Sequence, residues 1–250
     1  MAIRGCHEQA SARLDSLSGM SAQFTTSGAL RRLEVDGRSV LLYPADDLEA
    51  GPANLYLRLL KGPQVEILAM LGPQAGGSLV WTAAGPIISG RWRDLEYRLA
   101  FRLAAALTAW FWHLEVINRG SIAVQVDVIH TQDVALAPYS MVRTNEYYLS
   151  QYLDLTAVRT ESVGMAVAVR QNMPGLGAPW LLLGCLGEGV GWGTDALQLG
   201  RPAAAGDPLP GLLAARLPST RLQPEPTPAV LPERGTVLRP GAPPAAGCFA

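Results

Sequence analysis

The stretch that decides the fold runs from Leu95 to His130 and reads LEYRLAFRLAAALTAWFWHLEVINRGSIAVQVDVIH. Between residues 95 and 103, apolar side chains alternate with charged ones, which is the period of two that a half-buried β-strand requires. The same alternation continues on both sides of Arg119-Gly120. We therefore expect residues 108 to 130 to form a long antiparallel hairpin that turns at this dipeptide.

Further strand-like runs lie on both sides of this stretch, and glycine or proline separates most of them. They cover residues 29–35, 38–43, 54–60, 64–71, 87–92, 165–170 and 180–186. The first two runs flank Asp36-Gly37, a dipeptide that favours a tight turn between paired strands. Helical periodicity is nearly absent. The pattern predicts an all-β protein built as a large antiparallel β-sandwich.

The composition divides the chain into three parts. We expect a leader at 1–20, a β-sandwich domain at 21–200 and a Pro/Ala-rich segment at 201–250, which holds eleven of the nineteen prolines. The last ten residues have no pattern that predicts packing, and a short helix at 209–217 and a late strand at 235–239 are the elements expected in this segment. The chain is expected to be a fragment that stops before a further domain.

Charge and cysteine spacing exclude several classes of partner. The chain has 20 basic and 21 acidic residues, a net charge of −1 and no basic cluster, so nucleic acid is not an expected partner. Cys6, Cys185 and Cys248 lie far apart and predict neither a zinc site nor a disulfide framework. The longest apolar run, 103–112, is about half the length that crosses a bilayer. We expect a cytoplasmic protein without a membrane partner.

The candidate binding site is the stretch from Thr131 to Asp154, TQDVALAPYSMVRTNEYYLSQYLD. It is expected to be a loop that faces a sugar, because planar hydrogen-bonding groups suit hydroxyls and flat rings suit the C–H faces of a pyranose. The alternative is a long connection held together by its own side chains. The candidate substrate-binding residues are Gln132, Asp133, Arg143, Asn145, Glu146, Tyr148, Gln151 and Tyr152.

Few residues could catalyse a reaction within this chain alone. His113, His130 and Glu115 are the only groups placed to act as a histidine acid and a glutamate base, and a partly buried structural histidine is the stronger interpretation of His113. His130 lacks further metal ligands nearby, so no metal site is predicted. Trp110 and Trp112 are expected in the core. We predict no catalytic residue and no cofactor.

Four segments resemble a known family. They are GPANLYLR at 51–58, the stretch 131–154 quoted above, VAVRQN at 167–172 and APWLLLGCLGEGVGWGTDALQLG at 178–200. Together they are similar to the N-terminal part of the 1,2-β-oligoglucan phosphorylases of glycoside hydrolase family 94, which also holds the cellobiose phosphorylases. The resemblance covers roughly residues 20 to 240. It implies a galactose-mutarotase-like supersandwich that precedes an (α/α)₆ barrel.

The resemblance also implies a function for the whole enzyme. Such glycoside phosphorylases, which are glycosyltransferase-type enzymes, cleave a β-1,2-glucosidic bond with inorganic phosphate and inversion, and a carboxylic acid protonates the leaving oxygen. The acid and the phosphate site belong to the barrel. This chain is therefore expected to be silent alone, with a β-1,2-linked gluco-oligosaccharide and the barrel as partners. A stand-alone carbohydrate-binding module and a mutarotase-like sugar epimerase remain alternatives.

A docking face for a barrel has a physical consequence. A sandwich that a barrel normally covers should expose a contiguous apolar patch when it stands alone. We expect this patch near 138–152 and in the Pro/Ala-rich segment. Such a patch would lead the chain to form a homodimer.

Overall fold

The computed structural model describes residues 13–200, 209–214, 216–217, 219–222, 228–242 and 245–249. Strands make up most of the regular structure in these ranges, and all pairings between the named strands are antiparallel. The predicted all-β class is confirmed. The described residues also contain one α-helix, α1 (Tyr139–Ser150), and two 3-10 helices, η1 (Ala196–Gln198) and η2 (Pro210–Leu213).

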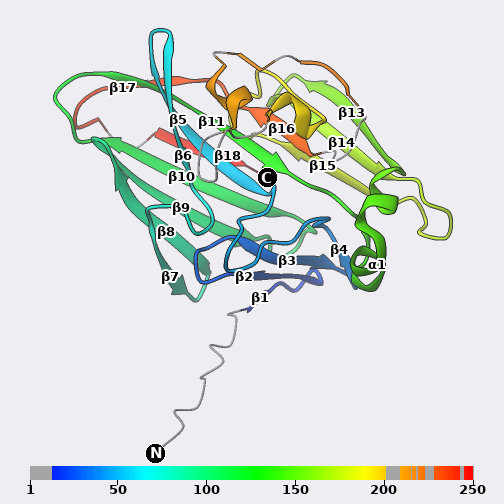
Figure 1. Ribbon diagram of the computed structural model, residues 1–250. Helices are drawn as coiled ribbons and strands as arrows, with labels where there is room; N and C mark the ends of the chain where they lie inside the picture. The colour runs from blue at the N-terminus through cyan, green and yellow to red at the C-terminus, as the bar shows by residue number, and fades with distance from the viewer. Residues whose placement is uncertain are drawn as a thin grey trace, which may run out of the picture.

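The strands form four antiparallel sheets (Figure 1). The first sheet contains β1 (Arg13–Asp15), β2 (Met20–Phe24), β3 (Leu30–Val35), β4 (Arg38–Ser39) and β12 (Ala137–Pro138). The second contains β18 (Ala245–Phe249), β10 (Trp110–Asn118), β9 (Leu95–Leu103), β8 (Gly85–Trp92) and β7 (Ser78–Thr82). The third contains β16 (Ala229–Pro232), β11 (Val124–Gln132), β5 (Asn54–Lys61) and β6 (Gln64–Ala69), with β17 (Thr236–Leu238) also paired to β11. The fourth contains β13 (Leu153–Thr160), β14 (Gly164–Gln171) and β15 (Trp180–Gly184).

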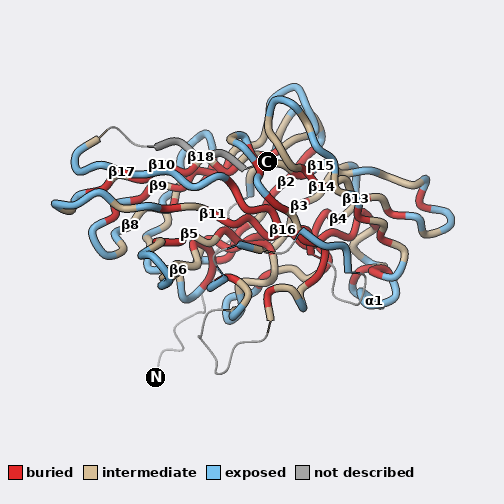
Figure 2. Tube along the Cα trace, turned by 90° about the horizontal axis from the view of Figure 1, so that it is seen from above, coloured by how far each residue is buried: buried red, intermediate tan, exposed pale blue. Residues whose placement is uncertain are grey.

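A cluster of aromatic rings joins the first sheet to the second. The ring of Phe24 on β2 meets Phe101 on β9 at 5.0 Å between centroids, and Phe101 meets Trp112 on β10 at 4.8 Å, both edge to face. Such pairs add to the stability that their burial provides. Trp110 and Trp112 are buried, as predicted. The buried parts of the strands meet in the middle of the molecule (Figure 2).

The predicted turns had different outcomes. Asp36 and Gly37 both have positive φ, 48° and 76°, and they connect the paired strands β3 and β4 as expected. The hairpin predicted for 108–130 is wrong, because β10 pairs with β9 and β18 whereas β11 pairs with β5, β16 and β17. The segment between β10 and β11 carries the chain from the second sheet to the third.

Buried Asn118 fixes this crossover. Its side-chain amide donates to the carbonyl oxygens of Ile122 at 2.7 Å and Leu238 at 3.0 Å, and its oxygen accepts from the N–H of Gly120 at 2.9 Å. One side chain thereby satisfies three backbone groups from the crossover and from β17. A period of two indicates that a segment is a strand, but it does not identify the neighbouring strand.

The Pro/Ala-rich segment completes the sheets. β16 and β17 pair with β11, which includes the predicted late strand, and β18 lies beside β10. The expectation that the last ten residues do not pack is therefore wrong for 245–249. Residues 1–12 of the predicted leader lie outside the described residues, while β1 at 13–15 pairs with β2.

A buried ion pair lies at the centre of the third sheet. Arg58 on β5, which is 1% exposed, donates from Nε and Nη2 to both carboxylate oxygens of Asp127 on β11, at 2.7 Å each. Its Nη1 donates to the carbonyl oxygens of Leu212 and Ala214. The guanidinium therefore joins the two central strands to the segment that contains η2.

A second buried charge holds the end of β11. Asp133 is 2% exposed, and its Oδ2 accepts from the backbone N–H groups of Leu42 at 2.8 Å and Tyr43 at 2.5 Å. Burial raises the pKa of this carboxyl group from 3.8 to about 6, although the two N–H donors act in the opposite direction. Asp133 thereby attaches the chain after β4 to the chain that leads into β12 and α1.

Removing the arginine side chain should be costly. Arg58→Ala leaves the Asp127 carboxylate almost buried without its cation, so we expect the free energy of unfolding to fall by about 3–5 kcal/mol. Arg98→Ala is the control, because Arg98 and Glu115 form an exposed pair at 3.6 Å that is worth about 0–1 kcal/mol. Urea unfolding measures both variants, and equal losses would contradict the role of Arg58.

The Asp133 carboxyl group should make stability depend on pH. The carboxyl group of Asp133 binds its proton more tightly in the folded protein than in the unfolded chain. Protonation of Asp133 therefore stabilises the fold fully below pH 3.8, and this stabilisation is lost as the pH rises through about 6. This loss amounts to about 3 kcal/mol. Asp133→Asn keeps an oxygen acceptor but does not titrate, so urea unfolding across this range should show a flatter profile.

The wild-type protein and Asp133→Asn must be compared, because a second buried carboxyl group also makes stability fall as the pH rises. Burial raises the pKa of Glu233 from 4.5 to about 7, so a slope of the same sign remains in the variant. The difference between the two profiles therefore reports Asp133. Parallel profiles for the wild-type protein and Asp133→Asn would contradict the assignment.

Candidate functional site

The stretch from Thr131 to Asp154 is more ordered than the sequence indicated. It contains the end of β11, then β12, helix α1 and the start of β13, so the expectation of a loop is wrong. Val142 and Leu149, seven residues apart, are the buried apolar residues of the helix. This spacing is helical, and it was the available sequence signal.

Buried contacts fix α1 against the sheets at one end of the molecule (Figure 1). Val142 and Leu149 belong to a small apolar cluster with Leu42, Ala135, Ala137 and Leu176. The amide of Gln171, at the end of β14, donates to the carbonyl oxygens of Ala135 at 3.0 Å and Leu149 at 3.3 Å. The chain therefore holds both ends of this segment before any ligand binds.

Asn145 interrupts the helix. Its backbone is extended, with φ −164° and ψ 84°, and its side-chain oxygen accepts from the N–H of Tyr148 at 2.9 Å. This is the geometry of a residue that caps a new helical turn. The break separates Tyr139–Thr144 from the turn that carries Tyr148.

The structure places the eight candidate residues in two groups. Gln132 and Asp133 are buried, and their side chains bind the protein's own backbone. Burial removes these two from the set that can face a ligand. The other six lie on or directly after α1, where Tyr152 is half-buried and the rest are exposed; they are Arg143, Asn145, Glu146, Tyr148, Gln151 and Tyr152.

Arg143 and Glu146 line the larger of two hollows beside the helix. This hollow has a volume of about 690 Å³ and lies between α1 and the segment 42–52. Asp46 and Glu49 also line it, so a single cationic side chain stands among three carboxylates. Sequence reasoning missed Asp46 and Glu49, because they lie about 90 residues before α1 and no local pattern connects them to it.

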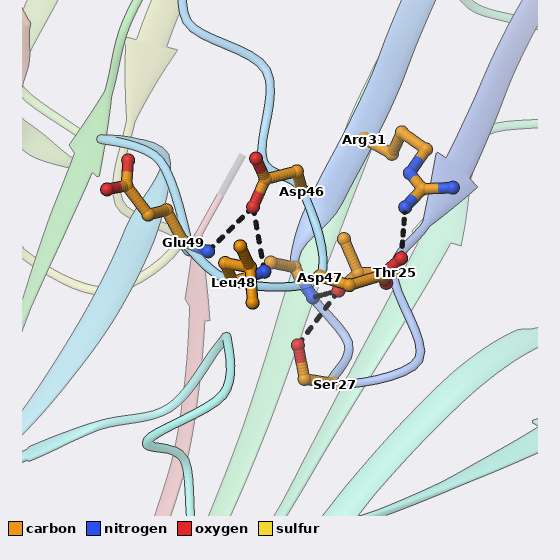
Figure 3. A network of polar contacts seen from close by, with 8 residues as sticks. Thr25, Ser27, Arg31, Asp46, Asp47, Leu48 and Glu49 are labelled. Atoms are coloured by element: carbon orange, nitrogen blue, oxygen red, sulfur yellow. Dashed lines mark hydrogen bonds and ion pairs between the residues drawn. The ribbon is translucent and has the colours of Figure 1, made fainter.

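The segment that contains Asp46 is held in shape by its own hydrogen bonds (Figure 3). Asp46 accepts from the N–H groups of Leu48 at 2.7 Å and Glu49 at 2.8 Å, and these bonds hold the pKa of its carboxyl group below the usual value. Arg31 donates to Asp47 at 2.7 Å. This wall of the hollow is therefore preorganised.

The smaller hollow carries the aromatic side of the site. It has a volume of about 210 Å³ and is lined by Asn145 and Tyr148, with Met173 from the chain after β14. The hydroxyl of Tyr148 lies 2.8 Å from that of Tyr152, and the two rings meet edge to face with 5.2 Å between centroids. The pair holds the Tyr148 ring at the rim of the hollow.

The other candidates do not gather into a second site. His130 is fully buried, and this burial lowers its pKa to about 4, so it is neutral near pH 7. His113 and Glu115 lie on β10 with intermediate exposure. Within the described ranges, no three His, Cys, Asp or Glu side chains are grouped to hold a metal ion, and no helix is long and apolar enough to cross a membrane.

Comparison with known proteins relates the chain to carbohydrate-active enzymes. It is 28% identical over 187 residues to a 1,2-beta-oligoglucan phosphorylase of Listeria innocua, in a match that covers 72% of this chain and 16% of that protein. Among solved structures, a polysaccharide lyase matches 92% of this chain and 31% of its own, with a TM-score of 0.56. At 12% identity, the second match shows a shared fold alone.

The family match covers nearly the whole sequence. The model of the SOGP N-terminal domain matches residues 23–247. The resemblance to the N-terminal part of the 1,2-β-oligoglucan phosphorylases is thereby confirmed. The chain belongs to the SOGP N-terminal domain family.

Proposed function

We propose that this chain binds a β-1,2-linked gluco-oligosaccharide along helix α1 and forms one wall of the active site of an inverting oligoglucan phosphorylase. The observation that carries the proposal is that four of the six exposed or half-buried candidates line the two hollows beside α1; they are Arg143, Asn145, Glu146 and Tyr148. The similarity to a 1,2-beta-oligoglucan phosphorylase supports the choice of sugar.

The two sides of α1 suit the two surfaces of a pyranose. Arg143 offers a planar set of N–H donors, and Glu146 offers acceptors to the hydroxyl groups of the sugar rim. On the other side, Tyr148 presents a ring that can lie against the C–H face of a sugar. Because Asn145 interrupts the helix between these positions, its own amide is also exposed at the break.

The remaining parts of the reaction belong, in this proposal, to a separate helical barrel. Inverting phosphorolysis needs a carboxylic acid at the leaving oxygen and a bound phosphate in place of water. We assign neither to this chain, which acts without a cofactor and without catalysis of its own. We place the protein in the cytoplasm, within the architecture of glycoside hydrolase family 94 and its mutarotase-like sandwich.

Substitutions on α1 should weaken sugar binding. Tyr148→Ala removes the ring and Arg143→Ala removes the guanidinium, so each should raise the Kd for a β-1,2-gluco-oligosaccharide. For Arg143→Ala a factor of about ten or more is expected, since hydrogen bonds to a charged group contribute roughly 1.5–3 kcal/mol. For Tyr148→Ala the loss comes from the removed ring contact. Isothermal titration calorimetry on the purified chain measures this effect.

Tyr147 provides the matched control. It lies on the same helix and is 59% exposed, but it lines neither hollow. Tyr147→Ala should leave the Kd unchanged, and Tyr148→Phe should keep most of the affinity because it keeps the ring. Equal losses for Tyr147→Ala and Tyr148→Ala, or no binding by the wild-type chain, would refute the proposed site.

Catalytic silence can be measured separately. The chain with inorganic phosphate and a β-1,2-gluco-oligosaccharide should release no glucose 1-phosphate. Release above a blank without protein would show that the chain carries its own acid and phosphate site. A faster interconversion of glucose anomers would instead support a mutarotase-like enzyme.

A further inference from the structure

Exposed apolar side chains lie on β15 rather than on α1. In the range 138–152, the large exposed hydrophobic residues are Tyr147 and Tyr148, which also carry hydroxyl groups. On β15, Trp180 is 60% exposed and Leu182 is 61% exposed, while the intervening residue faces the core. The range 138–152 therefore lacks the predicted exposed aliphatic side chains, whereas exposed Leu213, Leu222 and Val237 lie in the Pro/Ala-rich segment and β15 presents two apolar side chains on one face.

The strand β15 is an edge of its sheet. Among the described residues it pairs with β14 alone. The N–H of Gln171 donates to the carbonyl oxygen of Pro179, and this bond shows which residues of β15 point their backbone groups toward β14. Since hydrogen-bonded pairs alternate along antiparallel strands, Trp180, Leu182 and Gly184 direct their N–H and C=O groups away from β14.

Nothing in the sequence of β15 opposes the addition of another strand. Natural edge strands are usually protected by charged side chains, proline or a bulge. The sequence of β15 is WLLLG, which has no charge and no proline, and its pairing with β14 keeps one register throughout. The strand itself therefore brings no charge to a second copy, and a cation beside it on this face is Arg170 on β14, whose guanidinium lies 5.3 Å from the centre of the Trp180 ring.

We propose that β15 pairs with β15 of a second copy of this chain, antiparallel and around a twofold axis at Leu182. The outward N–H of Leu182 donates to the carbonyl oxygen of Leu182 of the partner subunit, and its own carbonyl oxygen accepts from that residue's N–H. Trp180 then lies opposite Gly184 of the partner subunit, whose missing side chain leaves room for the indole. The edge is self-complementary, which is what a twofold interface requires.

The exposed area indicates the strength of this dimer. The Trp180 side chain exposes roughly 150 Å², if about 250 Å² is taken for a whole Trp. Leu182, which is 61% exposed, extends the same face. Such a surface belongs to the small and transient interfaces that bury less than about 1,200 Å² in total. We therefore expect a dimer that forms reversibly with concentration.

This interface is independent of the proposed sugar site. None of the residues that line the two hollows beside α1 belongs to β15. Loss of the dimer should therefore leave the affinity for the oligosaccharide unchanged. Conversely, Tyr148→Ala should leave the dimer intact.

Sedimentation equilibrium over a concentration series tests the proposal on the full chain. The wild-type protein should approach the dimer mass at high concentration, and Leu182→Lys should raise the dimer Kd at least about tenfold by placing two like charges across the axis. Leu197→Lys is the control, because Leu197 is also 61% exposed and lies outside the sheet. A wild-type monomer at every concentration, or equal effects of the two lysines, would overturn the proposal.

Amide hydrogen exchange supplies a second measurement. In the dimer, the N–H groups of Trp180, Leu182 and Gly184 should become protected at high protein concentration. Those of Leu181 and Leu183 already bind β14 and should be protected at all concentrations. A dimer without this alternating change would show that another surface joins the two copies.

Discussion

The third sheet depends on one buried charge, the guanidinium of Arg58. The chain removes this cation from water in the middle of the β5–β11 pair, so every donor that faces the interior needs an acceptor. Asp127 supplies two, and the carbonyl groups of Leu212 and Ala214 supply two more. The two bonds to carbonyl groups connect residues more than 150 positions apart. They hold the segment with η2 against the third sheet. Leu209, directly before η2, also lines the larger hollow.

The candidate site depends on the same kind of constraint at a second position. Asp133, before α1, accepts from the backbone of Leu42 and Tyr43, and Gln171 donates to backbone carbonyl groups before α1 and near its end, so the helix is fixed before any ligand binds. The helix then presents Arg143 and Tyr148 toward different hollows. Preorganisation of this kind lowers the entropic cost of binding any ligand at these hollows.

The sequence predicted strands better than it predicted their neighbours. The alternation in 95–103 and 124–130 identified β9 and most of β11, yet the hairpin expected between β10 and β11 does not exist. For the site, it identified the exposed residues of α1, but it grouped them with Gln132 and Asp133. A buried acid that accepts backbone N–H groups and an acid that binds a sugar have the same side chain, so the residue type does not separate them.

The sequence by itself determined the all-β class, the tight turn at Asp36-Gly37 and the region of the chain where polar and aromatic residues gather. These features are local, because backbone conformation and side-chain chemistry are set by neighbouring residues. Only the tertiary structure decided that β18 pairs with β10, that Asp133 lies inside, and that β15 pairs with β14 alone among the described residues. These outcomes depend on contacts between residues far apart in the chain, which a period of two does not encode.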